Sequence, residues 1–554
     1  MENKNRIKII PLGGLGEVGK NITVIEYGEE IMVIDCGMTF PDSDMLGVDV
    51  VIPDVNYLIE NKERVKGFFV THGHEDHIGA FPYILKQINA PIYGTKLTLG
   101  LIESKLEEVN MLGSTTLNLV KPGEIVKLDK LKVEFIRTNH SIADSCALAI
   151  HTPIGVIVHT GDFKVDFTPV DGEVIDLGRF AELGKRGVLL LMADSTNSGH
   201  KGYTMSEKTV GETLNNLFLK ADGRIIVATF ASNIHRLQQI INSSVKHGRK
   251  VAFSGRSMEK ISEVAIDLGY LNIPEGTLVD LKDIKLYNNE QITIVTTGSQ
   301  GEPMSALTRI ASGTHRSIQI QQGDMIIVSA TPIPGNEKPV SKVINELVKK
   351  GANVIYKAIE DIHVSGHACE EELKLIHSIV RPKFFMPVHG EHKHLIKHSL
   401  IAQQVGLEEK NTFILENGNV LELTRKTAKI NGKVQVGNVL VDGEGIGDIG
   451  NIVLKDRKIL SNDGVINVVA TIGRVSKELL CGPDIVTRGF IYVRESEELV
   501  AEIKEIATKS LQYCLDNRIL KFSDIKSHIK NEVGHFIYKK TKRRPIIMPI
   551  IMEV

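Results

Sequence analysis

Four metal-ligand side chains fall within six consecutive residues of this chain, inside the stretch THGHEDHIGAF. They are three histidines and one aspartate: His72, His74, Asp76 and His77. The strand-like run GFFV comes directly before them, and imidazole and carboxylate groups are donors that bind zinc or manganese. A solvent-facing loop explains any single histidine but explains this density poorly. The spacing therefore predicts a loop at the end of a strand that folds around metal ions.

Short β-branched runs alternate with turns through the first half of the chain, and several end in His, Asp or Gly. They include RIKIIPLGG, NITVIEYG, EIMVIDCG, KVEFIRTNH, CALAIHTPIG and GVIVHTGD. Such runs are typical of strands, so functional side chains are expected at strand ends. A second block alternates helical periodicity with strands such as IIVATF and VAFSG, as in a doubly wound unit. Histidines return in DIHVSGHA and PVHGE, so the second block is predicted to be inserted into the first.

The length of 554 residues exceeds what one hydrophobic core holds and predicts about three or four domains. We assign residues 1–205 and 358–440, the latter including a linker, to one domain, and residues 206–357 to the insert. Beyond these, residues 441–554 change character and predict a small α+β domain with two amphipathic helices. The basic run near residues 539–544 is typical of a solvated face, with an RNA contact as the alternative.

Overall composition narrows the class of protein without giving its activity. The formal net charge of −2 gives no global signal for nucleic acid, although balanced totals can hide a local basic groove. No apolar run is long enough to cross a bilayer and no signal-peptide pattern begins the chain, so we expect a cytoplasmic protein. The cysteines are scattered without paired spacing and are expected to be reduced: Cys36, Cys146, Cys369, Cys481 and Cys514.

The stretch GLGEVGKN, residues 14–21, fits a dinucleotide-binding pattern and differs by one residue from a phosphate-binding loop, because Asn21 stands where Ser or Thr is required. Both motifs need a helix after the glycines. Here the strand-like run NITVIEYG follows instead. The favoured interpretation is a tight glycine-rich hairpin that borders a site, with nucleotide binding as the alternative.

The pattern H-x-H-x-D-H resembles the signature of the metallo-β-lactamase superfamily. The resemblance implies three further ligands at later strand ends, and the chain offers His140 in TNHS, Asp162 in HTGDF and His389 in PVHGE. It also implies two divalent ions, the first held by His72, His74 and His140, the second by Asp76, His77 and His389, with Asp162 between them. Zinc is the preferred assignment, with manganese or magnesium as alternatives. Two such ions share an activated hydroxide and clamp the reacting oxygens, which suits phosphodiester hydrolysis.

The insertion between Asp162 and His389 and its flanking motifs resemble the β-CASP group of this superfamily, whose members act on nucleic acids. The motifs are ADSTN with Asp194, HVSGHA with His367, and PVHGE. The resemblance implies that Asp194, His367 and Asp162 are catalytic. Asp194 would orient His367 and raise its pKa, and His367 would stabilise or protonate the leaving 3′-oxygen. The alternative for Asp194 is a helix or turn cap.

Nearly the whole chain resembles the bacterial ribonuclease J family, through GGLGEVGKN, THGHEDHIGA, HTGDFK, ADSTN, ATFASNIHR, TTGSQGEP, HVSGHA and PVHGE. The implied fold is a metallo-β-lactamase αββα sandwich with an inserted β-CASP α/β domain and a small α+β C-terminal domain. The implied activity is metal-dependent 5′→3′ exonucleolytic cleavage of RNA, favouring a 5′-monophosphate, with endonucleolytic cleavage, in RNA decay and in rRNA and mRNA maturation. Some members carry an eroded metal motif, whereas HGHEDH is intact here.

The family pattern also indicates which residues contact the substrate. They form two segments: Ser232, Asn233 and Ile234, and then His363, Val364, Ser365, Gly366 and His367. Small, glycine-containing loops offer backbone N–H and hydroxyl donors that surround a phosphate closely. The neighbouring His235 and Arg236 would add positive charge there or lie on the surface at a helix start.

Partners and a structural cation complete the expectations. The implied partners are single-stranded, 5′-monophosphorylated RNA, a second or fourth copy of the chain, a paralogous subunit and proteins of an RNA-decay complex. Asp49 and Asp442 are candidate ligands of a structural calcium ion, with a solvated loop as the alternative. Two other functions stay open: a DNA-directed β-CASP nuclease, and a subunit that binds RNA without cleaving it.

Overall fold

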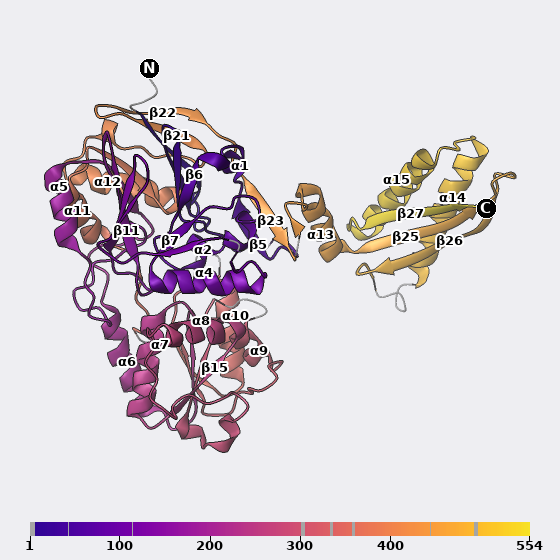
Figure 1. Ribbon diagram of the computed structural model, residues 1–554. Coiled ribbons are helices and arrows are strands. Elements are labelled where there is room, and N and C mark those ends of the chain that lie inside the picture. The colour runs from indigo at the N-terminus through magenta and orange to yellow at the C-terminus, as the bar shows by residue number, and fades with distance from the viewer. Residues whose placement is uncertain are drawn as a thin grey trace. The chain divides into compact units, whose positions relative to one another are not determined.

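The computed structural model describes residues 6–42, 44–113, 115–300, 305–332, 336–356, 361–443, 445–491 and 497–554. Residues 301–303 of the TTGSQGEP motif lie outside these ranges. The chain forms two compact units, Met1–Thr39 with Ile52–Val439, and Phe40–Val51 with Leu440–Val554. Figure 1 traces both by residue number.

The first unit contains two large sheets that carry the site. The eight-stranded sheet has the order β22 (Ala428–Lys433), β21 (Asn419–Leu423), β1 (Ile7–Gly13), β3 (Ile22–Tyr27), β4 (Glu30–Ile34), β6 (Val65–Phe69), β7 (Ile92–Gly94), β8 (Leu117–Leu119). The six-stranded sheet has the order β19 (Phe384–Val388), β13 (Val188–Asp194), β12 (Gly155–His159), β11 (Cys146–Thr152), β10 (Lys132–Arg137), β9 (Ile125–Lys127).

Apolar side chains of both sheets interdigitate in one buried cluster, to which β1 contributes Ile9, β6 Phe69, β11 Leu148 and β19 Met386. The outer face of the six-stranded sheet packs in a second cluster against α5 (Leu177–Arg186), α11 (Glu370–Val380) and α12 (His392–Gln404). The remaining helices of this region are α1 (Asn56–Glu60), α2 (Glu75–Ile78), α3 (Phe81–Ile84) and α4 (Lys96–Glu108). Apolar positions on alternate faces of each strand produce this layering.

A five-stranded, all-parallel sheet forms the inserted domain, with the order β15 (Lys250–Ser254), β16 (Ile292–Thr296), β14 (Ile225–Ala228), β17 (Met325–Val328), β18 (Asn353–Tyr356). Its helices are α6 (Glu207–Lys220), α7 (Ile234–Lys246), α8 (Arg256–Asp267), α9 (Ala306–Ser312) and α10 (Glu337–Lys349). The flanking strands β13 and β19 are parallel neighbours. The chain therefore leaves and re-enters one sheet around this domain, which confirms the predicted insertion.

The second unit is α+β, as expected. Its three-stranded sheet has the order β26 (Leu479–Arg488), β25 (Val465–Ile472), β27 (Ile546–Glu553), and α14 (Glu497–Asp516) and α15 (Phe522–Thr541) bury their apolar faces on it. Helix α13 (Asn451–Asp463) precedes β25. The basic run at the end of α15 is exposed, and Arg544 lies over the ring of Tyr538, consistent with a solvated face.

Three short strands form a further sheet, in the order β24 (Gly445–Ile446), β23 (Asn438–Asp442), β5 (Val50–Pro53). Among the residues that the structure describes, no helix combines the length and apolar character that a bilayer crossing requires.

Candidate metal centre

The carboxyl ends of parallel strands supply most of the site. In one sheet His72 follows β6, which runs parallel to β4 and β7. In the other sheet Asp162 follows β12, Asp194 ends β13 and His389 follows β19, and these three strands are parallel neighbours. Because such ends meet at a common sheet edge, residues far apart in sequence converge there. The short helix α2 then turns Asp76 and His77 back towards that edge.

Three histidines form the first ligand group. The Nδ1 atom of His74 lies 3.1 Å from Nε2 of His72 and 3.1 Å from Nε2 of His140. These three atoms belong to one cluster of potential metal ligands.

The second group joins Asp76, His77, His389 and Asp162. Oδ2 of Asp76 lies 3.1 Å from His389 Nε2 and 3.5 Å from His77 Nε2. Oδ2 of Asp162 lies 3.3 Å from His77 Nε2 and 3.7 Å from His389 Nε2.

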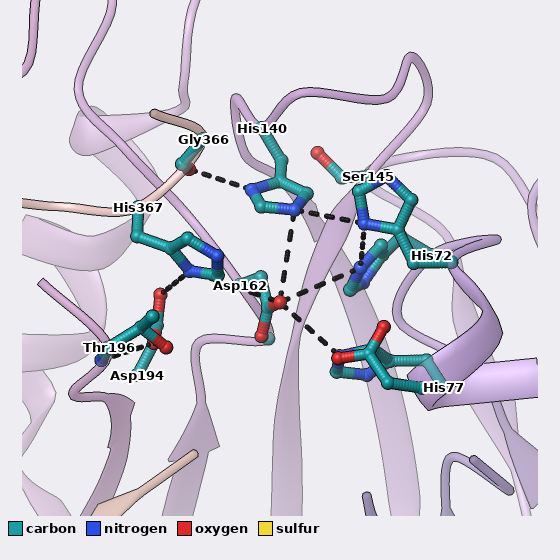
Figure 2. A network of polar contacts seen from close by, with 12 residues as sticks. His72, His77, His140, Ser145, Asp162, Asp194, Thr196, Gly366 and His367 are labelled. Carbon is teal, nitrogen blue, oxygen red and sulfur yellow. Dashed lines mark hydrogen bonds and ion pairs between the residues drawn. The ribbon is translucent and has the colours of Figure 1, made fainter. Parts of the chain in front are cut away.

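Asp162 stands between the two groups. The same Oδ2 atom lies 3.8 Å from Nε2 of His72 and 3.8 Å from Nε2 of His140. Figure 2 shows this carboxylate among His72, His77 and His140, with His367 and Asp194 beside it. All seven residues that the sequence singled out as ligands are thus brought together.

The spacing and protonation of these groups fit metal binding. Ligand atoms about 2.0–2.1 Å from a tetrahedral zinc stand roughly 3.3 Å apart, close to the separations above. Four histidines direct Nδ1 at an oxygen, which leaves Nε2 for a cation. The partners are Thr71 Oγ1 for His72, Asp35 Oδ2 for His77, the Gly366 carbonyl for His140 and Thr196 Oγ1 for His389.

Burial and charge set the protonation of the ligands. Burial lowers the pKa of His74 to about 4 and also lowers the pKa of His72 and of His140, which favours the neutral imidazoles that metals require. Burial opposes the charge on His77 as well, but the carboxylates of Asp162, Asp76 and Asp35 together outweigh it and raise the pKa of His77. The negative charge of Asp162 therefore attracts a cation, whether a proton or a metal ion.

Asp35 supports the site and was not singled out from the sequence. It follows β4 with φ of 59° and accepts hydrogen bonds from Thr71, through the backbone N–H at 2.8 Å and through the hydroxyl. Its Oδ2 lies 2.8 Å from His77 Nδ1. The signal was present in VIDCG, a strand run that ends in Asp.

The glycine-rich stretch is a hairpin loop between β1 and β3, followed by a strand and not by a helix. Its Asn21 side chain lies 3.1 Å from the carbonyl of Asp76 and 3.2 Å from Nε2 of His77. The expected hairpin bordering a site is therefore confirmed, and the side chain that breaks the phosphate-loop pattern contacts the second ligand group.

Asp194 and His367 form a pair beside the ligands. Asp194 Oδ2 lies 2.7 Å from His367 Nδ1, while Oδ1 accepts the backbone N–H of Thr196 at 3.0 Å. The turn-capping role and the pairing role thus use different oxygens of one carboxylate. Burial opposes the charge on His367, but the charge and hydrogen bond of Asp194, together with the charge of Asp162, outweigh it and raise the pKa of His367.

The two segments expected to contact substrate lie together. Asn233 caps α7 by accepting the backbone N–H of Arg236, and Ile234 is buried. The guanidinium of Arg236 donates to the carbonyl of Ile362, directly before His363. Val364 is buried as well, whereas Ser232, His363, Ser365 and His367 are partly exposed.

The candidate calcium ligands already have protein partners. Asp442 forms an ion pair with Arg457 at 2.6 Å, and Asp49 accepts the N–H of Gly443 at 2.8 Å. Neither belongs to a cluster of three potential metal ligands among the described residues. A structural calcium ion stays a prediction.

Four family models match the chain. They are the metallo-β-lactamase superfamily over residues 15–178, the ribonuclease J β-CASP domain over 222–347, the Zn-dependent metallo-hydrolase RNA specificity domain over 351–414 and the ribonuclease J C-terminal domain over 452–554. Together they follow the order of the domains described above.

Curated proteins match over all or most of the chain. Ribonuclease J2 of Bacillus subtilis (strain 168) is 43% identical over 553 residues, covering 100% of both chains. Ribonuclease J 1 of Streptococcus pyogenes serotype M3 is 46% identical, covering 99% of this chain and 98% of its own. Ribonuclease J of Synechocystis sp. is 47% identical, covering 93% and 80%.

A solved structure, that of a protein of unknown function from Enterococcus faecalis V583, matches with a TM-score of 0.55 at 17% identity, covering 76% of this chain and 100% of its own. At that identity it supports the fold alone. The full-length matches decide the family: the chain belongs to the ribonuclease J family of metal-dependent hydrolases.

Proposed function

We propose that this protein is a two-metal ribonuclease that cleaves RNA phosphodiesters. His72, His74 and His140 would hold one ion, and Asp76, His77 and His389 the other, with Asp162 shared between them. When bound, such ions lower the pKa of a water molecule and neutralise charge on the phosphate oxygens. Zinc suits this donor set best, and manganese or magnesium are the alternatives.

One observation carries this proposal: potential ligand atoms of seven residues, from the stretch 72–77 and from three later strand ends, converge in two groups. Oδ2 of Asp162 lies 3.8 Å from His72 Nε2 in the first group and 3.3 Å from His77 Nε2 in the second. Four of the histidines also direct Nδ1 at an oxygen. A chance cluster of histidines has no reason to share this arrangement, whereas metal-binding histidines usually bond an oxygen through the ring nitrogen that does not face the metal.

The Asp194–His367 pair would serve the leaving group. With Nδ1–H donated to Asp194, the other ring nitrogen of His367 carries the proton that can pass to the departing 3′-oxygen. Asp194 would orient the ring and favour its protonated form. Asp162 would contribute to catalysis by holding both ions in place.

Recognition of a 5′-monophosphate would use the two segments that lie together, residues 232–234 and 363–367. Helix α7 begins at Ile234, and the positive end of its dipole favours an anion. Hydroxyl and glycine N–H groups of the second segment would complete the pocket. We therefore propose 5′→3′ exonuclease activity that favours a 5′-monophosphate, together with endonuclease activity, in RNA decay and in rRNA and mRNA maturation.

The test compares 5′-monophosphate, 5′-triphosphate and circular forms of one RNA with metal-reconstituted protein. Mononucleotide release from the monophosphate form supports the exonuclease, and cleavage of the circle supports the endonuclease. Failure to cleave any of the three contradicts the proposal. A 5′-phosphorylated DNA of the same sequence separates the ribonuclease from a DNA-directed nuclease.

Several finer assignments belong to the same proposal. The domain boundaries are 1–205 with 358–440, 206–357 and 441–554, and the protein works in the cytoplasm. It assembles as a homodimer or homotetramer and associates with a paralogous subunit and RNA-decay proteins. Light scattering after size-exclusion chromatography measures the oligomer, and a monomer at micromolar concentration would contradict it.

A further inference from the structure

Among the residues that the structure describes, Arg236 has the largest fully buried side chain. Its place at the start of α7 predicted either added charge in the pocket or a surface position, and the structure contradicts both. Its guanidinium pairs with Glu207, the first residue of α6, through Nη2 at 2.8 Å from Oε2 and through Nε on Oε1. A buried charge is costly unless it is paired and hydrogen-bonded, so this position needs a structural reason.

The remaining donors of Arg236 join two distant segments. Nη1 donates to the carbonyl of Ser329 at 2.9 Å, to its hydroxyl at 2.8 Å and to the carbonyl of Ile362 at 3.3 Å. The Ser329 hydroxyl itself donates to the Ile362 carbonyl at 2.5 Å. The backbone N–H of Arg236 donates to Asn233 at 3.0 Å. Arg236 therefore contacts the first pocket segment through its backbone N–H, and its guanidinium contacts Ile362, the residue directly before the second segment.

The second segment continues directly into the metal centre. The Gly366 carbonyl accepts the Nδ1–H of His140 at 2.7 Å, and His367 pairs with Asp194. On the other side, the backbone N–H of Glu207 donates to Asp166, four residues beyond the shared ligand Asp162. Both ends of the Arg236 network thus reach chain segments that carry metal ligands.

We propose that Arg236 and Glu207 are positioning residues that hold the two phosphate-pocket segments in register with the metal centre. This inference rests on the proposed 5′-monophosphate recognition. Arg236 is fully buried, so it acts through the side chain of Asn233 and the carbonyl of Ile362 and not by touching RNA. A planar guanidinium spans Glu207, Ser329 and Ile362 together, which the single ammonium of lysine cannot do.

A second buried pair provides a matched control. Arg224 bonds Asp324 through Nε at 3.0 Å and Nη2 at 2.6 Å, in the same domain. It precedes β14, at the end of the parallel sheet opposite to Ser329, which follows β17. Arg224→Lys therefore disturbs a similar ion pair in the same core, away from both pocket segments.

The experiment measures the ratio of kcat/KM for 5′-monophosphate RNA to kcat/KM for 5′-hydroxyl RNA, with metal content and melting temperature for each protein. Arg236→Lys should lower this ratio about tenfold by displacing the pocket segments, chiefly by raising KM for the monophosphate. Arg224→Lys should leave the ratio at the wild-type value. If Arg236→Lys fails to fold, Ser329→Ala replaces it as the test. This variant removes one hydroxyl only and should also lower the ratio.

The outcomes separate the two proposals. A wild-type ratio near one contradicts 5′-monophosphate recognition and this inference with it. A high wild-type ratio that survives Arg236→Lys, or survives Ser329→Ala where the lysine variant does not fold, leaves the function intact and overturns the positioning role. An equal fall in Arg224→Lys shows a general loss of domain stability and overturns it as well.

Discussion

The Nδ1 atom of His367 lies 2.7 Å from Oδ2 of Asp194 and 4.0 Å from Oδ2 of Asp162. The proposed proton donor His367 therefore lies beside the ligand groups, and its ring clusters with Asp194, Asp162 and His389. Its backbone is fixed too, because Thr204 and Asn197 both donate to its carbonyl, at 2.7 and 3.0 Å. Such multiple anchoring pre-organises a catalytic group.

Removing either member of this pair should slow the chemistry without emptying the metal site. Asp194→Asn and His367→Ala should each lower kcat by about 10²–10⁴-fold, the range for general acid–base groups. Because the two act as one unit, the double variant should be no slower than the slower single variant. Single-turnover kinetics measure this, and additive losses would show that the residues act independently.

Removing a metal ligand should have a different signature. His77→Ala deletes a ligand of the second group only, whereas Asp162→Ala deletes the carboxylate that both groups share. Hydrolysis should fall to background in both, and Asp162→Ala should lose more metal. Elemental analysis of bound metal per chain checks this, with His151→Ala, a histidine paired with Glu134, as the control. Full activity in either ligand variant would sink the metal assignment.

Asp35 should tune metal affinity from behind the ligands. Asp35→Asn weakens the acceptor that fixes the ring of His77, and outer partners of this kind are worth roughly 10–100-fold in metal affinity. Competition with a chelator measures the affinity. Asp324→Asn, which disturbs a buried ion pair in the inserted domain, should leave it unchanged. Equal metal affinity in wild type and Asp35→Asn would show that Asp35 does not support metal binding.

Acid should destabilise the fold partly through His377, which is buried between α11 and α12. Burial lowers its pKa to about 3. An unfolded chain takes up this proton as the pH falls through about 6.5, so the stabilisation is complete above that pH and is lost as the pH falls towards 3. Between pH 7 and 5, His377→Gln should reduce the slope of the unfolding free energy against pH by up to about 1.4 kcal/mol per pH unit. Urea denaturation at each pH measures this free energy. The same slope against pH in wild type and His377→Gln would contradict the prediction.

The sequence identified the residues that converge in the candidate metal centre because most of them follow strand-like runs. Residues 72–77 contain four potential metal ligands in six positions, and His140, Asp162 and His389 follow recognisable strand runs. The groups that support these residues are harder to predict. Gly366 contributes a backbone carbonyl and Thr196 a hydroxyl, and neither group has a recognisable sequence pattern. Asp35 shared the strand-end pattern but had no neighbouring histidine to distinguish it.

Burial was the other quantity that the sequence left open. Arg236 follows FASNIH at the start of a helix, where exposure is usual for arginine. Only the tertiary arrangement of α6, β17 and the segment before residue 363 encloses it. Long-range pairing of this kind has no local periodicity, so a motif can identify a site while the contacts that hold it in place stay hidden.

The central claim is that two ions held by these seven ligands cleave RNA. The most direct measurement loads the chelator-treated protein with two equivalents of zinc or manganese and follows a 5′-monophosphate RNA by gel electrophoresis. The account predicts release of mononucleotides that stops with chelator and returns with metal. Intact RNA in the presence of protein shown to carry both ions would contradict it.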